Sequence, residues 1–206
     1  MKKVFTKNNS LYLLTDRNIA GLPHIQIVRK ALKAGVRVIQ FREKNMSKKE
    51  LYKEAVSIRE IVGKYRATLI INDYVDIAKA VDAHGVHLGQ EDMPVEEARK
   101  VLGKRKIIGI STHSVAQAVR AERAGADYIG FGPIFQTSTK DAGRPKGIDS
   151  LRKIRKRTHI AVVAIGGITW ENVHEVLESG ADACAIAAGI LSGDIEENIK
   201  RFYDAI

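Results

Sequence analysis

The chain repeats one kind of junction four times, and this repetition restricts its fold more than any other feature of the sequence. A helical pattern ends at a small residue near a glycine and runs directly into an apolar stretch, at Ala34-Gly35-Val36, Ala83-His84-Gly85-Val86, Ala124-Gly125-Ala126-Asp127 and Ser179-Gly180-Ala181-Asp182. Because glycine takes the left-handed conformation that closes a helix, each junction is typical of a helix that feeds a strand. The sequence therefore predicts a repeated βα unit.

Eight candidate strands alternate with helical patterns along the 206 residues. The predicted strands are Leu11–Thr15, Val36–Phe41, Thr68–Ile71, Gly85–Leu88, Lys106–Ile110, Tyr128–Phe131, Ala161–Ile165 and Cys184–Ala187, and the helical patterns include Lys48–Lys64, Pro94–Leu102, Val115–Ala124 and Trp170–Glu178. Eight alternations favour an α/β fold, a single-domain closed (β/α)8 TIM barrel over residues 1–206, with residues 1–9 as a short N-terminal extension. An open doubly wound sheet is the alternative, although the first βα turn lacks the glycine-rich dinucleotide fingerprint.

Composition narrows the classes of partner. The chain carries 34 Lys and Arg against 24 Asp and Glu, a net charge of +10, which suits either nucleic acid or a phosphorylated substrate with solvated helix faces. Aromatic residues are not interleaved with the basic ones, so we expect no nucleic-acid partner. No apolar run approaches the roughly 20 residues that span a bilayer and no signal-peptide pattern follows the first residues, so we expect a cytoplasmic protein without membrane contact. The single cysteine, Cys184, is predicted to lie in the core.

Polar residues gather at the end of the second predicted strand, and strand ends form the functional face of such a barrel. Alternation sends Gln40 and Arg42 to the barrel side and Phe41 to the helix side, with Lys44 just beyond. Buried Gln and Arg side chains need partners, so we expect them to contact a ligand. An internal polar network near the top of the barrel is the alternative.

The next two strand ends carry carboxylates. Asn72 and Asp73 follow the third strand, and His87 and Asp92 lie at and after the end of the fourth. Two carboxylates from neighbouring strand ends fit Mg²⁺ shared with a diphosphate, with Asp73 and Asp92 as the metal ligands. Asp92 could instead cap the following helix, and His87 is as well explained by a hydrogen-bonded barrel histidine as by a substrate contact.

Hydroxyl groups and small residues mark the remaining strand ends. Ser111 stands at the tip of the fifth strand and is a candidate phosphate contact, whereas Ser114 could cap the next helix. The loop after the sixth strand, within 127–146, combines hydroxyl and basic residues that suit a phosphate site. Glycines and alanines after the seventh and eighth strands let backbone N–H groups approach a second phosphate, with tight turns as the alternative.

Taken together, these segments resemble the thiamine phosphate synthase family. The motifs that carry the resemblance are LLTD at 13–16, QFREK at 40–44, IIND at 70–73, GVHLGQED at 85–92, GIS.H at 109–113, ADYIGFGPIF.T.TK at 126–140, AIGGI at 164–168 and GAD at 180–182. They occur in order over nearly the whole chain. The family joins hydroxymethylpyrimidine diphosphate to a thiazole phosphate, which gives thiamine phosphate and diphosphate.

The resemblance implies a role for each matching residue. It implies that Gln40 holds the aminopyrimidine and that Asp73 and Asp92 bind Mg²⁺ as the cofactor, while His87 stays a candidate substrate contact on the residue pattern alone. The implied diphosphate ligands are Arg42, Lys44, Asn72, Ser111 and Lys140. All of these except Asn72 are also implied to be catalytic residues. The implied thiazole phosphate site consists of Thr137, Thr139 and the backbone at Gly167, Ala187 and Ala188. Many relatives carry a serine at the position of Ala188, so we expect about one hydrogen bond fewer there.

Two other functions compete with synthesis. Thiazole tautomerases share the barrel, but commonly carry a histidine where this chain has Pro133, which cannot exchange protons. A non-catalytic protein that binds thiamine phosphate or thiazole phosphate is the second alternative. The sequence leaves open whether the protein is a homo-oligomer and whether it prefers the free or the carboxylated thiazole phosphate.

Overall fold

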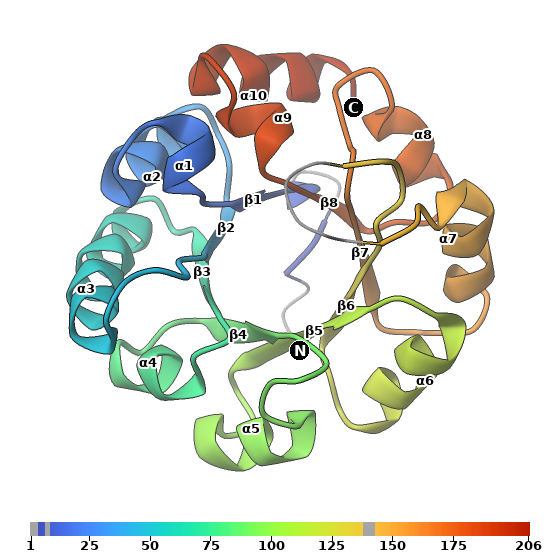
Figure 1. Cartoon of the computed structure of the whole chain (residues 1–206), viewed down its shortest axis with the longest axis horizontal. Helices are drawn as coiled ribbons and strands as arrows, with labels where there is room; N and C mark the ends of the chain where they lie inside the picture. The colour runs from blue at the N-terminus through green and yellow to red at the C-terminus, as the bar shows by residue number, and fades with distance from the viewer. Residues whose placement is uncertain (1–3, 7–8, 138–142) are drawn as a thin grey trace.

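Parallel strands close into a barrel in the computed structural model, which describes residues 4–6, 9–137 and 143–206 (Figure 1). Within these residues the eight strands pair in chain order, and β8 pairs with β1 through Leu11 beside Cys184 and Leu13 beside Ile186. The strands are β1 Leu11–Leu14, β2 Val38–Phe41, β3 Thr68–Asn72, β4 Gly85–Leu88, β5 Ile107–Thr112, β6 Tyr128–Phe131, β7 Ala161–Ile165 and β8 Ala183–Ile186. The predicted barrel is confirmed and the open sheet is wrong.

Helices surround the strands as an outer ring, and Figure 1 shows the successive βα units following one another around the barrel. The helices are α1 Arg17–Ala20, α2 His24–Lys33, α3 Lys48–Lys64, α4 Val75–Ala80, α5 Val95–Leu102, α6 Val115–Arg123, α7 Gly147–Arg155, α8 Val173–Glu178, α9 Ala188–Leu191 and α10 Ile195–Asp204. None of the helices described is both long and apolar enough to cross a membrane.

Two strands, β3 and β5, extend further than hydrophobicity predicted, whereas β1 and β8 end one residue earlier than predicted. β3 runs on to Asn72, which pairs with His87, and β5 runs on to Thr112, which pairs with Phe131. Ladder hydrogen bonds to the neighbouring strands extend the regular backbone past the last apolar side chain, which a hydropathy pattern does not report. Asn72 and Ser111 are therefore held by the sheet itself.

Three of the four predicted helix-closing glycines are confirmed, with φ of 105° at Gly35, 85° at Gly125 and 104° at Gly180. The prediction is wrong for Gly85, because Asp82 takes the left-handed conformation there, with φ of 51°. Gly85 already belongs to β4, where a Cβ atom would lie 2.2 Å from the carbonyl oxygen of Ile107. Its role is close approach between strands.

The core has an outer and an inner part. The outer part lies between strands and helices and includes Ile39 and Phe41, as alternation predicted, and Cys184, whose core position is also confirmed. The inner part fills the barrel with Tyr12, Val38, Ile70, Tyr128, Val163, Ala183, Ala185 and Phe5. Phe5 precedes β1, in the segment expected to be an extension, yet its ring packs 5.3 Å from the ring of Tyr128.

Gly109 leaves the space that the ring of Tyr128 occupies. A Cβ atom at Gly109 would lie 2.0 Å from Cζ of Tyr128, whose side chain is almost fully buried. We expect Gly109→Ala to reduce the free energy of unfolding by about 1–3 kcal/mol or more, because a packed barrel interior cannot move aside. Urea denaturation followed by circular dichroism measures this.

Gly63→Ala is the matched control for this substitution. Gly63 lies inside α3, and the nearest neighbour of an added Cβ is the Arg59 guanidinium at 3.4 Å. We expect it to be neutral or to stabilise the fold by up to about 1 kcal/mol, since alanine is the better helix former. Equal destabilisation by both substitutions would contradict the assigned role of Gly109.

Candidate functional site

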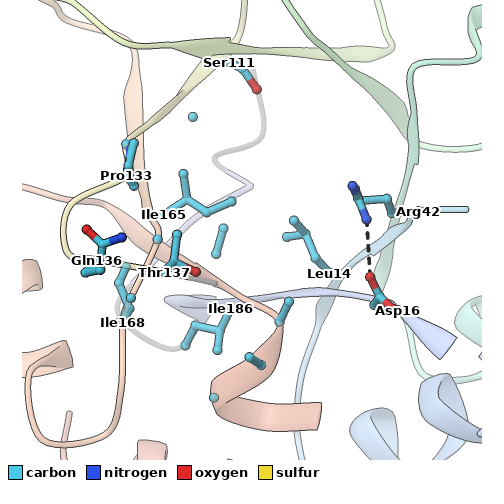
Figure 2. A pocket seen from close by; sticks show the side chains of 18 of the residues that line it. Leu14, Asp16, Arg42, Ser111, Pro133, Gln136, Thr137, Ile165, Ile168 and Ile186 are labelled. Carbon is cyan, nitrogen blue, oxygen red and sulfur yellow. Dashed lines mark hydrogen bonds and ion pairs between the residues drawn. The ribbon is translucent and has the colours of Figure 1, made fainter. Parts of the chain in front are cut away.

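A cavity of about 680 Å³ opens at the carboxyl ends of the strands. Of the residues predicted to bind substrate, it brings together Arg42, Ser111, Thr137, Gly167, Ala187 and Ala188. Figure 2 shows Arg42 on one side of the cavity, Pro133, Gln136 and Thr137 on the opposite side, and Leu14 between them. The site therefore has a charged wall at Arg42 and Asp16 and, opposite it, a wall that combines polar and apolar side chains.

Arg42 extends from the end of β2 into this cavity. Its side chain is 22% exposed, and its guanidinium lies 3.4 Å from Oδ2 of Asp16 (Figure 2). The other carboxylate oxygen of Asp16 accepts hydrogen bonds from the N–H groups of Asn18 and Ile19, so this residue also caps α1. A long contact with one carboxylate oxygen leaves most guanidinium donors available to an anion.

Lys44, Asp73 and Asp92 form a second charged group, and none of the three is among the residues that line the cavity. Lys44 Nζ lies 2.5 Å from Oδ2 of Asp73, and Oδ2 of Asp92 accepts a hydrogen bond of 2.6 Å from the N–H of Gly89. Burial raises the pKa of the Asp92 carboxyl, the Gly89 N–H partly offsets this, and the neighbouring Asp73 carboxyl raises it further. A cation between two such carboxylates would relieve their repulsion, so the pair fits Mg²⁺.

Asp73 and Asp92 would supply only part of the coordination shell of a metal ion. Among the residues that the structure describes, no group of three or more His, Cys, Asp or Glu side chains could hold a metal ion, so water and phosphate oxygens would complete the shell. Helix α5 begins after Pro94 and no side chain caps it, so Asp92 is not the cap considered as an alternative. Ser114, in contrast, caps α6 as expected through a hydrogen bond with the N–H of Gln117.

Asn72 carries a buried donor without a partner. The residue is 7% exposed, and its Nδ2 makes no hydrogen bond within the described chain. Asn72 lies two residues after Ile70 on β3, hence on the inner side of the barrel. An unsatisfied buried amide is costly, and an anionic oxygen would satisfy it.

Gln40 and His87 belong to a polar network inside the barrel and do not line the cavity. Gln40 Nε2 donates to the hydroxyl of Tyr12 at 2.7 Å, and the hydroxyls of Tyr12 and Tyr128 lie 2.9 Å apart. His87 Nδ1 lies 2.9 Å from the Tyr128 hydroxyl, and its Nε2 lies 2.9 Å from Oγ of Ser111. The network considered as an alternative for Gln40 is present, and it reaches the cavity at Ser111.

The far side of the cavity is built from the loops after β6, β7 and β8. The loop after β6 is tied to β7 by hydrogen bonds from the N–H of Ile134 to Ile165 and from that of Phe135 to Gly166. Gly167 has φ of 64°, and a Cβ there would lie 2.4 Å from the carbonyl oxygen of Gln136. This close packing gives the glycine a structural reason in addition to any phosphate contact.

Thr139 and Lys140 lie outside the described residues, so their predicted roles remain predictions.

Glu43 was missed by the sequence interpretation although it lies inside the QFREK motif. It is 8% exposed, and its Oε1 accepts hydrogen bonds of 2.7 Å from the N–H groups of both Lys44 and Asn45. Its Oε2 lies 2.8 Å from Nε of Arg17 and 3.2 Å from Nε2 of the buried His24. Glu43 thus fixes the loop that presents Arg42 and Lys44. The sequence signal that could have indicated this role is a carboxylate placed just before the N–H groups of a loop.

These contacts predict an acid-sensitive contribution to stability. Burial raises the pKa of Glu43, but the hydrogen bonds from Asn45, His24 and Lys44 and the charge of Arg17 outweigh it and lower the pKa to about 2. Because the folded pKa is lowered, the stabilisation is present above the ordinary value near 4.5 and is lost as the pH falls toward 2. It amounts to roughly 3 kcal/mol, since one pKa unit corresponds to about 1.4 kcal/mol.

Glu43→Gln tests this contribution. We expect the difference in unfolding free energy between wild type and Glu43→Gln to shrink as the pH falls from the neutral range through 4.5, the ordinary pKa. Denaturant unfolding at several pH values measures the difference. The exposed Glu97, which pairs only with Lys100 at 2.7 Å among the described residues, supplies the control Glu97→Gln. A pH-independent difference for Glu43→Gln would contradict the assignment.

A closed barrel with a charged cavity at the carboxyl ends of its strands is the architecture of the (β/α)8-barrel enzymes. The family model described as thiamine monophosphate synthase matches residues 11–190. The chain therefore belongs to the thiamine monophosphate synthase family, and it is an enzyme of the transferase class.

Individual relatives agree with this assignment. The chain is 44% identical over 208 residues to the thiamine-phosphate synthase of Methanosarcina mazei, covering 100% of this chain and 86% of that protein. It is 48% identical over 193 residues to that of Caldanaerobacter subterraneus subsp. tengcongensis, covering 93% and 90%. A solved structure of thiamine phosphate pyrophosphorylase from Pyrococcus furiosus superposes with a TM-score of 0.89 at 40% identity, covering 96% and 95% of the two chains.

Proposed function

We propose that this enzyme condenses 4-amino-5-hydroxymethyl-2-methylpyrimidine diphosphate with 4-methyl-5-(2-hydroxyethyl)thiazole phosphate, or its carboxylated form, to give thiamine phosphate and diphosphate. The observation that carries the proposal is the Nδ2 of Asn72, which has no hydrogen-bond partner among the described residues and stands at the end of β3, next to the end of β2 that Arg42 and Lys44 follow. A buried donor and the cations Arg42 and Lys44 together suit a polyanion. The relatives described above support the same reaction.

The diphosphate end of the site would lie at β2, β3 and β5. Arg42, Ser111 and Asn72 would donate hydrogen bonds to the departing diphosphate, and Lys44 would leave Asp73 to add a further positive charge. The Lys44 side chain is 48% exposed, so it can turn toward a ligand at small cost. Such donors matter because negative charge builds on the leaving group as the bond to the pyrimidine methylene breaks.

Asp73 and Asp92 would hold Mg²⁺, with water and diphosphate oxygens as the remaining ligands. The bound ion would supply neutralisation of the leaving group's charge. The chain's own contribution is the carboxylate pair, of which Asp92 is kept in place by the N–H of Gly89.

The second substrate would occupy the apolar part of the cavity. Leu14, Ile165 and Ile186 provide a surface for the thiazole ring, and Thr137 with the backbone at Gly167 and Ala187 to Ala188 would receive its phosphate. The enzyme then aligns the thiazole nitrogen with the methylene carbon from which diphosphate departs. Alignment and charge neutralisation suffice for this substitution, so no protein nucleophile is required.

The decisive experiment combines both phosphorylated precursors with the protein and Mg²⁺ and measures thiamine phosphate and diphosphate. Equal formation of both products supports the proposal. Binding of either precursor without turnover would instead indicate a non-catalytic phosphate-binding protein, and isomerisation of a thiazole phosphate alone would indicate a tautomerase. We propose the cytoplasm as the place of this reaction, and small phosphorylated molecules as the partners.

A further inference from the structure

Four hydrogen bonds link Gln40 to Ser111 through the barrel interior. They connect Gln40 to Tyr12, Tyr12 to Tyr128, Tyr128 to His87, and His87 to Ser111, with separations of 2.7, 2.9, 2.9 and 2.9 Å. Tyr12 and Tyr128 are each 1% exposed and Gln40 is 2% exposed, so water does not readily replace a missing partner. The hydroxyl protons of the two buried tyrosines therefore need acceptors within the series.

One end fixes the direction of the whole series. Gln40 Nε2 is an amide nitrogen that only donates, so the Tyr12 hydroxyl accepts there. The proton of Tyr12 then has one acceptor within reach among the described residues, the oxygen of Tyr128. If Tyr128 donated to Tyr12 instead, the Tyr12 proton would be buried without a partner.

The direction of donation set at Tyr12 continues through Tyr128 and His87 to Ser111 at the cavity. Because Tyr128 accepts from Tyr12, its own proton goes to Nδ1 of His87. A neutral imidazole with an accepting Nδ1 carries its proton on Nε2, which donates to Oγ of Ser111. The hydroxyl proton of Ser111 is then directed to a partner other than His87, and Ser111 lines the cavity.

We propose that Tyr12 and Tyr128 are positioning residues that fix opposite hydrogen-bonding characters at the two ends of the series, an acceptor at Gln40 and a donor at Ser111. Gln40 lies below the residues that line the cavity and commits its Nε2 to Tyr12; its Oε1, to which no described residue donates, is left as the acceptor for a substrate that reaches into the barrel. This inference rests on the proposed function, because an exocyclic amino group is a donor and a diphosphate is an acceptor. The two tyrosines thereby match both ends of one substrate before it binds.

The direction has a spectroscopic signature in the free protein. Long-range ¹H–¹⁵N correlation spectra of the ¹⁵N-labelled full chain distinguish the two neutral histidine tautomers, and His87→Gln assigns the His87 signals. We expect the Nε2–H tautomer for His87. A proton on Nδ1, or on both ring nitrogens, would reverse or break the series and overturn the proposal.

Two phenylalanine substitutions separate a directional role from packing. In Tyr12→Phe, Tyr128 still donates to His87, so the Nε2–H tautomer should persist. In Tyr128→Phe, Nδ1 of His87 loses its donor and the tautomers should mix. Tyr203→Phe is the matched control. Tyr203 lies in α10, and the substitution removes a hydroxyl that donates to the carbonyl of Gly35 at 3.0 Å. It should leave the tautomer and the kinetics unchanged.

Kinetics connects the series to substrate. Both variants should lower kcat/KM for the pyrimidine diphosphate by about tenfold, the loss expected from one misdirected hydrogen bond, while the KM for the thiazole phosphate stays at its wild-type value. Identical tautomer changes in both variants would indicate packing and overturn the directional role. If Tyr128→Phe fails to fold, the wild-type spectrum and Tyr12→Phe still decide. The spectra need no substrate, so they stand even if wild type forms no thiamine phosphate, which would refute only the proposed function.

Discussion

Replacing Asp92 with asparagine should lower the rate of thiamine phosphate formation roughly 100-fold and abolish most of its dependence on Mg²⁺, because loss of a few kcal/mol of charge stabilisation corresponds to that factor. The substitution removes the charge and keeps an oxygen that accepts from the N–H of Gly89. Initial rates over a series of Mg²⁺ concentrations measure the effect.

The same substitution should not weaken the fold. Burial and the neighbouring Asp73 carboxyl raise the pKa of Asp92, so its charged form is unfavourable in the folded protein without a cation. We therefore expect Asp92→Asn to have a Tm equal to or above that of wild type. Asp76→Asn is the control, because it removes one carboxylate from an exposed pair with Lys48 at 2.7 Å. Wild-type rates for Asp92→Asn would remove Asp92 from the metal site.

Arg42→Gln should lower kcat/KM for the pyrimidine diphosphate by roughly 100- to 1000-fold, the range found when one donor to a developing negative charge is removed. Arg42 lines the cavity and its only ion pair among the described residues is the 3.4 Å contact with Asp16. Because the guanidinium stabilises the leaving group, we expect kcat to fall as well as KM to rise. Steady-state kinetics with each substrate varied in turn measures both.

Arg201→Gln is the matched control for Arg42→Gln. Arg201 lies on α10, and its side chain is 51% exposed in a helical ion pair with Glu197. Removing it should leave turnover at the wild-type level. If Arg42→Gln raised only KM with kcat unchanged, the residue would bind substrate and transition state equally, and its assignment to the leaving group would be wrong.

The barrel was predictable because each repeated βα unit has a recognisable pattern of neighbouring residues. Apolar stretches such as Tyr128–Phe131 and helix ends such as Gly125 recur along the chain. Recognising one βα unit therefore makes the next unit easier to recognise. Gly85 was misinterpreted since its sequence context resembles that of the helix-closing glycines, while the contact that requires it, with Ile107 of β5, is distant in the chain. Local patterns report conformation better than they report close approach.

The candidate site was predictable by position more than by contact. Strand alternation placed Gln40 and Arg42 on the inner side of the barrel, but nothing local indicated that Gln40 donates to Tyr12 or that Glu43 fixes the loop beside them. Tyr12 also reads as an ordinary apolar strand residue. Interactions between residues far apart in sequence become visible only when the strands are side by side.

The pairing of β1 with β8 also has a consequence for how the chain is made. Leu11–Leu14 leaves the ribosome early, but its second neighbour, Ala183–Ile186, is synthesised only after the other strands. Until then one edge of β1 and one edge of β7 present unpaired backbone groups, the kind of edge that recruits foreign strands. When the protein is synthesised slowly or overexpressed, we therefore expect aggregation to begin from incomplete chains that end before β8. Pairing of β8 with both β1 and β7 removes the two exposed edges at once.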